Sequence, residues 1–309
     1  MSILISVPVL TYNAAEFVED TLESIFNQTY QNIQLIVSDD CSKDATVEIV
    51  EKWCSQPRVK ERFVDIKITT VPKNTGVSAN CNRCIKESEA EWIKFIAGDD
   101  ILLPNCIEDN LKFVIENPEA KIIFSQVKVF QDTFEEPNFV KALPKNYPDN
   151  LMNVSFTADD QFKILVDSDR INYTPSYFFS KKTIEEIGSY DETNILVEDY
   201  PTWLKLTQSG VKLFYFHIPT VGYRIHANAT NNTGEVLFKP SVLNSYLVRK
   251  KYAHPYLPKY QSAFETWQYK MTLGFKKLGI TQKTNLNQWL YKTFVIYLNP
   301  FFYYKYFKR

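Results

Sequence analysis

Three pairs of adjacent acidic residues stand at the ends of predicted elements: Asp39-Asp40, Asp99-Asp100 and Glu198-Asp199. The first two pairs directly follow apolar runs, and neighbouring like charges near a protein interior repel by roughly a few kcal/mol unless something offsets them. A divalent cation held by carboxylate oxygen, and itself holding phosphates, offsets such charge. A solvated turn is the alternative after "KFIAG", since Gly and Asp both favour turns.

The elements that position these acids alternate between strand and helix over the first 130 residues. Near-continuous apolar runs predict strands at 3–13, 32–42, 62–76, 91–100 and 121–130, with helices between them. This alternation predicts a mostly parallel sheet flanked by helices, whose ligands bind outside the carboxyl ends of the strands. Three of those ends carry polar groups, which favours a site over a turn: Thr11–Asn13, Asp39-Asp40 and Asp99-Asp100.

The C-terminal part differs from the rest in charge. After an irregular stretch at 131–155, a helix at 158–168, a strand at 211–226 and a polar loop at 228–235, the pattern predicts basic, aromatic helices. From Lys239 to Arg309 there are 13 Lys and Arg residues against one acid, Glu265, whereas 22 basic and 35 acidic residues precede position 239. Such asymmetry predicts that the tail meets an anionic surface.

The aromatic residues of the tail indicate which anionic surface this is. They are interleaved with Lys and Arg at the end of the chain: Trp289, Tyr291, Phe294, Tyr297, Phe301, Phe302, Tyr303, Tyr304, Tyr306 and Phe307. Aromatic rings settle at the level of lipid headgroups and basic residues pair with anionic lipid, so we expect a membrane surface and no nucleic acid. Packing of these rings onto the catalytic domain is the alternative.

Cysteine usage and the apolar runs indicate the compartment. Five Cys residues, an odd number, are scattered through 309 residues, which is typical of a reducing compartment. Cys81 and Cys84 form a C-x-x-C without a second pair or a nearby His, which predicts one face of a helix and not a zinc site. The chain starts without the basic region and length of a signal peptide, and no window reaches the roughly 18 apolar residues of a spanning helix. We therefore expect a cytoplasmic protein, peripheral on the inner face of the cell membrane.

Several enzyme classes are excluded by the motifs that the sequence lacks. The first strand is followed by "VLTYNAAE", without the G-x-G-x-x-G turn of dinucleotide-binding enzymes, and neither a P-loop nor a G-x-S-x-G nucleophile elbow occurs. Acids without a glycine-rich phosphate loop indicate instead a metal ion that handles a diphosphate.

Five segments, in order and near the expected spacing, resemble the family 2 glycosyltransferases: "ISVPVLTYN", "LIVSDDCSKDAT", "NTGVSANCNRCI", "KFIAGDD" and "VEDYPTWLKL". The likeness covers about residues 2–226, and it extends to bacterial enzymes that build surface polysaccharides such as O-antigen and capsule. It implies the GT-A fold in residues 1–235, with a nucleotide-sugar-binding half at 1–125 and an acceptor-binding half at 126–235. Residues 236–309 are expected to form a helical, membrane-associating extension.

The resemblance also implies which residues contact the nucleotide sugar and the metal ion. Those expected at the nucleotide sugar are Pro8, Thr11, Asn13, Glu16, Asp39, Asp40, Asn74, Asn80, Arg83 and Asp100. The Asp-x-Asp tripeptide of many members aligns with Ala97, Gly98 and Asp99, so its first acid is missing and Asp99 is the expected ligand of Mg²⁺ or Mn²⁺. His226 stands where some relatives have a further metal ligand or a diphosphate contact. A core histidine is the alternative.

The family motif at Glu198-Asp199 implies the catalytic base. An inverting transfer needs a base that removes the proton of the acceptor hydroxyl as it attacks, and a carboxylate can do so in concert. Asp199 is the expected base, with Glu198 as its rival or its orienting neighbour. A pair of acids at a helix N-terminus is the alternative, since acids are favoured there.

The resemblance therefore implies a metal-dependent transferase that acts on a UDP-linked hexose or N-acetylhexosamine. The acceptor is expected to be a glycan carried by a polyprenyl diphosphate lipid. A sugar-nucleotide-binding protein with impaired catalysis is one alternative, because the first acid of the metal motif is missing. A nucleotidyltransferase is the other, although the basic or glycine-rich phosphate loop it needs does not occur early in the chain.

Overall fold

The computed structural model describes residues 2–145, 147, 150–226, 236–239 and 241–307. The loop expected at 228–235 and the last two residues of the basic tail lie outside the described residues. The chain divides into two compact units. The first comprises Met1–Ile164 and Arg170–His226, and the second comprises Leu165–Asp169 and Ala227–Arg309.

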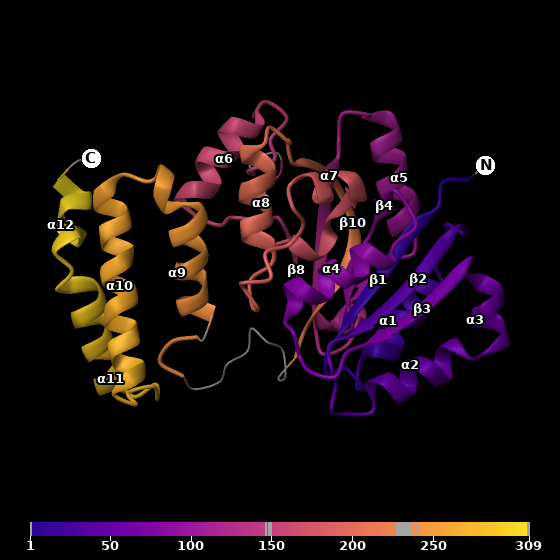
Figure 1. Ribbon diagram of the computed structural model, residues 1–309, viewed down its shortest axis with the longest axis horizontal. Coiled ribbons are helices and arrows are strands. Elements are labelled where there is room, and N and C mark those ends of the chain that lie inside the picture. The colour runs from indigo at the N-terminus through magenta and orange to yellow at the C-terminus, as the bar shows by residue number, and fades with distance from the viewer. Residues whose placement is uncertain (1, 146, 148–149, 227–235, 240, 308–309) are drawn as a thin grey trace. The chain divides into compact units, whose positions relative to one another are not determined.

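The first unit is built on one mixed sheet with the strand order β3-β2-β1-β4-β9-β7-β10-β6 (Figure 1). Strand β5 pairs with β1, and β8 pairs with β7. The strands are β1 (Ile5–Thr11), β2 (Ile33–Asp39), β3 (Asp65–Thr70), β4 (Trp92–Ile93), β5 (Ile96–Ala97), β6 (Ile101–Leu102), β7 (Ile122–Gln131), β8 (Phe139–Leu143), β9 (Phe178–Ser180) and β10 (Phe214–Ile225). β1 to β5 join in parallel, whereas β6, β8 and β9 pair antiparallel with their neighbours.

The two central strands place the polar rim, a name used here for the polar residues at the carboxyl ends of the strands: Thr11–Asn13, Asp39-Asp40 and Asp99-Asp100. All seven residues of β2 are buried, as are six of the seven in β1, which is the pattern of parallel strands covered on both faces. Their register runs from Ile5 opposite Ile33 to Thr11 opposite Asp39, so both strands end at the same edge. The strand expected at 91–100 is instead divided into β4 and β5, and the break falls beside the fully buried Lys94.

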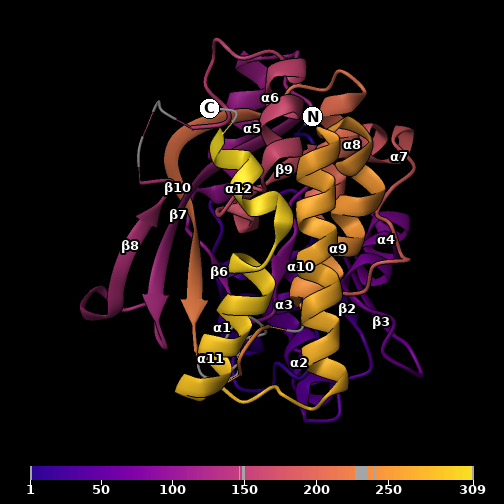
Figure 2. The same cartoon turned by 90° about the vertical axis from the view of Figure 1, so that its left-hand side faces the viewer.

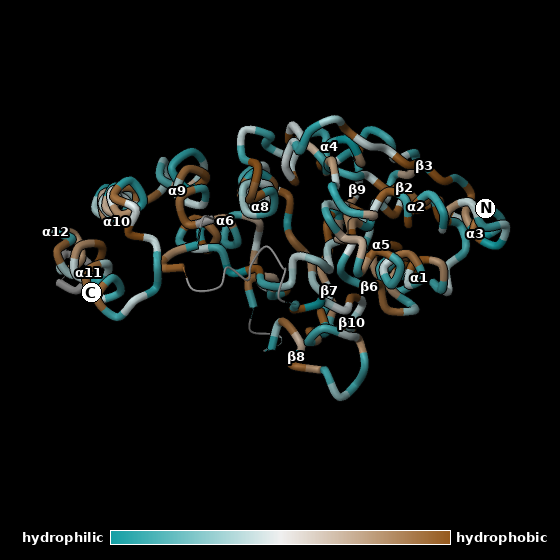
Figure 3. The backbone as a smooth tube through the Cα atoms, turned by 90° about the horizontal axis from the view of Figure 1, so that it is seen from below, coloured by the Kyte–Doolittle hydropathy of each residue, from teal (hydrophilic) through white to brown (hydrophobic). Residues whose placement is uncertain are grey.

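Helices cover both faces of this sheet. Figure 3 shows α4 on one side of the strands, and α1 and α5 on the other. The short α3 begins at Pro57 and was not expected from the sequence; Pro is well suited to the first turn of a helix. The helices that begin in this unit are α1 (Val18–Phe26), α2 (Thr46–Cys54), α3 (Pro57–Arg62), α4 (Val77–Glu87), α5 (Cys106–Glu116), α6 (Ala158–Asp167), α7 (Lys181–Glu186) and α8 (Asp199–Gln208), with 3₁₀ turns at Glu136–Asn138 and Thr174–Ser176.

The second unit is helical, as its composition predicted. Its helices are α9 (Ser241–Tyr252), α10 (Lys259–Lys277), α11 (Asn285–Tyr291) and α12 (Pro300–Phe307), with a 3₁₀ turn at His254–Tyr256 and a π-helical stretch at Lys292–Tyr297. The long α10 packs along α9 and α12 (Figures 1 and 2). Only Thr272 and Phe275 of α10 are buried. No helix among the described residues is both long and apolar enough to span a bilayer.

Candidate functional site

The ends of β1 and β2 are joined by side chains of the expected site. The Thr11 hydroxyl donates to Asp39 Oδ1 at 3.0 Å, and Asp39 also accepts the amide of Ser42 at 2.8 Å. Asn13, in the left-handed region with φ 52°, accepts the amide of Lys43 through Oδ1 at 2.7 Å. The two loops therefore hold each other through side-chain to backbone bonds, which fixes the rim before any ligand binds.

Asp40 organises the loop that follows β3. Its carboxylate is 3% exposed and accepts hydrogen bonds from the Thr75 hydroxyl at 2.6 Å, the Gly76 amide at 2.8 Å and Arg83 Nη2 at 2.8 Å. Burial by itself would raise the pKa of Asp40, but the bonds from Thr75 and Arg83 outweigh it and leave the pKa below its ordinary value. Asp40 is thus a charged anchor for residues 75–83.

The remaining residues expected at the nucleotide sugar divide by burial. Pro8 is buried within β1, and Asn80 is buried in α4, where its amide donates to the Ser38 carbonyl at 3.0 Å. Glu16 and Asn74 are exposed. The structure therefore places Glu16 and Asn74 where a ligand can reach them, whereas Pro8 and Asn80 can act on a ligand only by shaping the backbone.

Asp99 and Asp100 differ sharply in exposure although they are adjacent in the sequence. The Asp99 side chain is 35% exposed, whereas Asp100 is 2% exposed and accepts the Arg224 amide at 2.9 Å. Burial, helped by the charge of Asp99, raises the pKa of Asp100 well above its ordinary value. Gly98 makes the approach to β1 possible, because a Cβ there would lie 2.9 Å from Cγ2 of Thr11. Asp99 is therefore the carboxylate presented at the rim.

Arg224 fixes the backbone of Asp99 and is not free to neutralise phosphate. Its Nε donates to the Asp99 carbonyl at 2.9 Å and its Nη2 to the Asp20 carboxylate at 2.7 Å. The guanidinium lies between the rings of Phe17 and Phe134, at 4.7 and 4.3 Å from their centroids. Arg224 is only 4% exposed, so its charge stays within the protein.

His226 directly follows β10 and faces Asp99. Its Nε2 lies 3.2 Å from Asp99 Oδ2, and its ring packs on Phe17. Two ligands at right angles around an ion, each about 2.1 Å away, lie about 3 Å apart, so this pair fits one edge of a metal's coordination sphere. The described residues contain no group of three or more His, Cys, Asp or Glu donors. An ion here would take its other ligands from water and from substrate phosphate.

The acidic pair Glu198-Asp199 stands at the start of α8. Asp199 accepts the Thr174 hydroxyl at 3.1 Å and its neighbour's amide, that of Tyr200, at 2.7 Å. Glu198 occupies the cap position but makes no capping hydrogen bond, so helix capping does not account for it. Burial, with the charge of Asp199 added, raises the pKa of Glu198 to about 8, and burial raises that of Asp199 as well.

The side chains of Cys81, Tyr177 and Tyr190 lie near this pair, and no sequence pattern marked them as its neighbours. Burial raises the pKa of the Cys81 thiol in α4, and the nearby carboxyl groups of Glu198 and Asp199 raise it further. The hydroxyls of Tyr177 and Tyr190, 3.0 Å apart, lie in the same environment. Because dry surroundings favour the neutral form of a carboxyl group, they keep the pair's proton affinity high. A carboxylate of raised proton affinity is suited to accept a proton.

Comparison with known proteins gives a consistent result. Residues 6–173 match the family model described as Glycosyl transferase family 2. TuaG of Bacillus subtilis, a glycosyltransferase assigned to teichuronic acid biosynthesis, is 25% identical over 232 residues, which are 74% of this chain and 82% of TuaG. The Escherichia coli enzyme WfaP is named UDP-Glc:alpha-D-GlcNAc-diphosphoundecaprenol beta-1,3-glucosyltransferase. It is 23% identical over 246 residues, 78% of this chain and 86% of WfaP.

Solved structures share the fold. TarS of S. aureus, residues 1–349 in complex with UDP-GlcNAc, superposes with a TM-score of 0.58 at 16% identity, over 86% of this chain and 71% of that one. GalNAc-T7 with UDP, GalNAc and Mn²⁺ gives a TM-score of 0.57 at 12% identity, over 80% of this chain and 48% of that one.

Proposed function

Since this chain belongs to glycosyl transferase family 2 and is a nucleotide-sugar-dependent glycosyltransferase, we propose that it takes its sugar from a UDP-linked donor and inverts the anomeric carbon. The family resemblance and the GT-A fold expected from the sequence are both confirmed. The single observation that carries the proposal is the polar rim, where Thr11 and Asp39 end β1 and β2 and Asp99 follows the end of β5, three strands that pair in parallel. That is where ligands of such sheets bind.

The proposed donor site uses the rim and the loop anchored by Asp40. Asp99 and His226 would hold Mg²⁺ or Mn²⁺, and the ion would supply positive charge that stabilises the leaving diphosphate. In this assignment residues 1–125 bind the donor and residues 126–235 bind the acceptor. Asp39 and Asn13 shape the pocket for the nucleoside, and Arg224 holds the Asp99 backbone in place.

Asp199 is the proposed base. The acceptor hydroxyl oxygen attacks the anomeric carbon while the bond from that carbon to the diphosphate oxygen breaks, and the diphosphate keeps the electron pair. The hydroxyl proton passes to the Asp199 carboxylate. Thr174 orients that carboxylate through its hydrogen bond at 3.1 Å. Glu198, with a pKa raised to about 8, is protonated at neutral pH and leaves Asp199 as the charged member of the pair.

A lipid-linked glycan is the proposed acceptor. WfaP is named for an acceptor sugar joined to diphosphoundecaprenol and for a UDP-glucose donor, while the TarS structure contains UDP-GlcNAc. These names support a polyprenyl diphosphate carrier, and a hexose or N-acetylhexosamine as the transferred sugar.

The tail is proposed to bind an anionic membrane, on its inner face. Several large apolar side chains of α11 and the π-helical stretch are exposed: Leu286, Trp289, Phe294, Tyr297 and Leu298. The exposed Lys283 and Lys292 lie in the same segment, and α11 and α12 alternate between apolar and polar colours in Figure 3. A second copy of the chain is a poor partner for this face, because the net charge of +12 from Lys239 to Arg309 would be repelled by its equal.

A donor-binding and turnover experiment tests the proposed chemistry. UDP binding by calorimetry with and without Mn²⁺, and release of UDP from a panel of UDP-sugars, are measured for the wild type, Asp99→Ala and Asp199→Asn. We expect Asp99→Ala to lose metal-dependent donor binding and Asp199→Asn to bind donor normally without turnover. Release of pyrophosphate instead of UDP would identify a nucleotidyltransferase. No UDP binding and no turnover by the wild type would reject the proposal.

A vesicle experiment tests the membrane proposal. Full-length protein is expected to sediment with vesicles containing anionic lipid, and less so as salt rises, because such attraction is screened over about 8 Å at physiological ionic strength. The double variant Leu286→Glu/Trp289→Glu should stay in solution. Ile115→Glu, at an exposed apolar position of the first unit, is the matched control and should sediment normally. Equal sedimentation of both variants would mean that this face does not contact lipid.

A further inference from the structure

Residues 190–197, which lead directly into Glu198-Asp199, are fastened to helix α4. The Asn82 side-chain amide donates to the Tyr190 carbonyl at 3.0 Å, and the Tyr190 amide donates back to Asn82 Oδ1 at 3.0 Å. One turn earlier in the helix, the buried Ser78 hydroxyl donates to the Asn194 carbonyl at 2.8 Å. Two side chains of one helix therefore hold both ends of a five-residue stretch.

A glycine brings the two segments into contact. Gly76, at the N-terminal cap of α4, has φ 87°, a region that side chains with a Cβ adopt at a cost. A Cβ at this position would lie 2.7 Å from Cβ of Ile195. The Val77 amide also points to the Ile195 carbonyl, at 3.4 Å. Only a glycine at position 76 allows residues 194–195 to lie against the start of the helix.

The segment is also folded internally just before the acids. Asn194 is 9% exposed, and its side-chain amide donates to the Val197 carbonyl at 2.9 Å. Its Oδ1 accepts the Leu196 amide at 3.3 Å. Asn194 thus closes a turn that ends next to Glu198, and Ser78 holds the backbone of the residue on which this turn depends.

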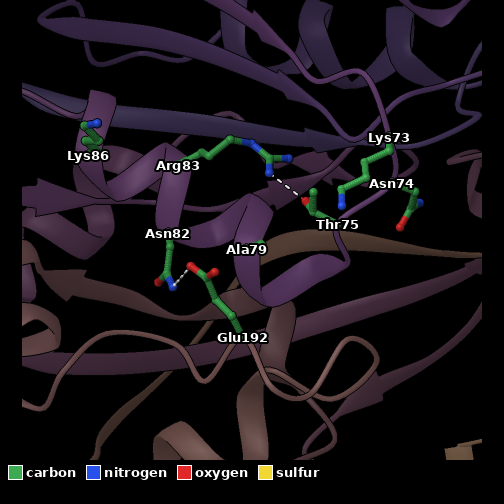
Figure 4. A pocket seen from close by; sticks show the side chains of 8 residues that line it. All are labelled: Lys73, Asn74, Thr75, Ala79, Asn82, Arg83, Lys86 and Glu192. Atoms are coloured by element: carbon green, nitrogen blue, oxygen red, sulfur yellow. Dashed lines mark hydrogen bonds between the residues drawn. The ribbon is translucent and has the colours of Figure 1, made fainter.

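The same helix holds the donor side of the site. Arg83, next to Asn82, donates to Asp40 at 2.8 Å and to the Thr75 hydroxyl at 2.7 Å. Figure 4 shows the two sets of bonds leaving neighbouring residues of α4, from Arg83 to Thr75 and from Asn82 to Glu192. A cavity of about 570 Å³ lies beside them. A shift of α4 would therefore move the donor loop and the segment before the acids together.

We propose that Asn82 and Ser78 are positioning residues, which act through residues 190–197 to hold Glu198-Asp199 in register with the bound donor. The inference rests on the proposed function, because it concerns the same acidic pair. Its physical basis is that rates depend steeply on the placement of a base: a displacement of about 1 Å costs on the order of 100-fold. Donor affinity, in contrast, is expected to depend on Arg83 and its bonds to Asp40 and Thr75, which do not involve Asn82 or Ser78.

The test compares Asn82→Ala and Ser78→Ala with the wild type in a transfer assay, with donor Kd measured separately by calorimetry. We expect kcat to fall about 100-fold for Asn82→Ala and about 10-fold for Ser78→Ala, with donor Kd unchanged within about twofold. Because Ala is a better helix former than Ser, Ser78→Ala is expected to leave α4 folded, so a loss of kcat in this variant would not come from misfolding. Lys86→Ala, on the same outer face of α4 as Asn82, is the control and should keep both parameters.

Two results would overturn the proposal. One is an unchanged kcat in both variants, and the other is a weakened donor Kd at an unchanged kcat, which would make these residues part of the donor site only. Asp199→Asn in the same assay separates this failure from that of the proposed function. If Asp199→Asn is inactive while both α4 variants turn over normally, the base stands and the positioning role falls. If Asp199→Asn turns over normally, the base assignment fails, and the kcat values of the two α4 variants still decide the positioning role, because they report on the placement of the whole acidic pair.

Discussion

Replacing Asp40 with Asn tests whether one carboxylate organises the donor loop. Every hydrogen-bond partner of the Asp40 carboxylate among the described residues is a donor: the amides of Thr75 and Gly76, the Thr75 hydroxyl and Arg83 Nη2. Asn is nearly the same size, but its NH₂ group is itself a donor. Wherever that group is placed, it faces at least one N–H group that it cannot satisfy, and the charge that offsets Arg83 is lost.

The cost can be worked out from these contacts. Breaking one partner of a buried ion pair costs about 3–5 kcal/mol, and a single hydrogen bond to a charged group contributes about 1.5–3 kcal/mol. Because the Arg83 side chain is 21% exposed and recovers some hydration, we expect the lower figure, a loss of about 3 kcal/mol in the free energy of unfolding. For a domain of this size that corresponds to a fall in Tm of roughly 6–12 °C.

Equilibrium urea denaturation at pH 7 measures this loss, with Glu51→Gln, an exposed position on α2, as the matched control. The pKa of Asp40 is lowered in the folded protein, so its stabilisation is present above the pKa of the unfolded chain and is lost as pH falls through the folded value. The difference in unfolding free energy between the wild type and Asp40→Asn should therefore disappear at acidic pH. A gap below about 1 kcal/mol at pH 7, or one that persists at low pH, would refute the reasoning.

Three further predictions follow from single contacts. In urea denaturation, Gly76→Ala should lower the free energy of unfolding by roughly 1–3 kcal/mol more than Gly210→Ala does. Both glycines have a positive φ, but only at Gly76 would the added Cβ clash, with Ile195; equal losses in the two variants would contradict this. Burial lowers the pKa of Lys94 from 10.5 to about 8. The wild type should therefore gain stability relative to Lys94→Met as pH rises from 8 to 10.5, and a difference in unfolding free energy that stays constant over this range would contradict the lowered pKa. Glu198→Gln should keep most turnover at pH 7, since burial raises the pKa of Glu198 to about 8, and it should gain stability relative to wild type as pH rises from 4.5 to 8. A variant inactive at pH 7 would make Glu198 the base.

The part of the fold that the sequence predicted is the part dictated by local pattern. β1 and β2 are near-continuous apolar runs, and a buried parallel strand needs little else, so their ends at Thr11 and Asp39 could be placed together. The convergence of Asp99 on the same rim followed from the same rule. Cys81 and Cys84 lie in one helix, buried as free thiols, as their spacing predicted.

The rest depends on contacts between residues far apart in the sequence. Whether Asp99 or Asp100 faces the rim is decided by Arg224, more than 120 residues later, whose amide binds the buried member of the pair. The break between β4 and β5 lies beside Lys94, whose ammonium donates to the carbonyls of Pro175 and Tyr177. No sequence pattern marks Thr174 as the partner of Asp199. The membrane contact of the tail and the roles of the site residues stay predictions.

Arg224 has a consequence for how fast the proposed metal ion would bind. Because its guanidinium clamps the Asp99 carbonyl and its amide holds Asp100, the loop carrying the exposed carboxylate has already lost its conformational freedom. An ion bound by Asp99, as proposed above, would therefore order no chain, and little entropy would oppose its binding. The slow step would be the loss of water by the ion itself, which Mg²⁺ gives up reluctantly. Association rates would then follow the identity of the cation and be insensitive to solvent viscosity.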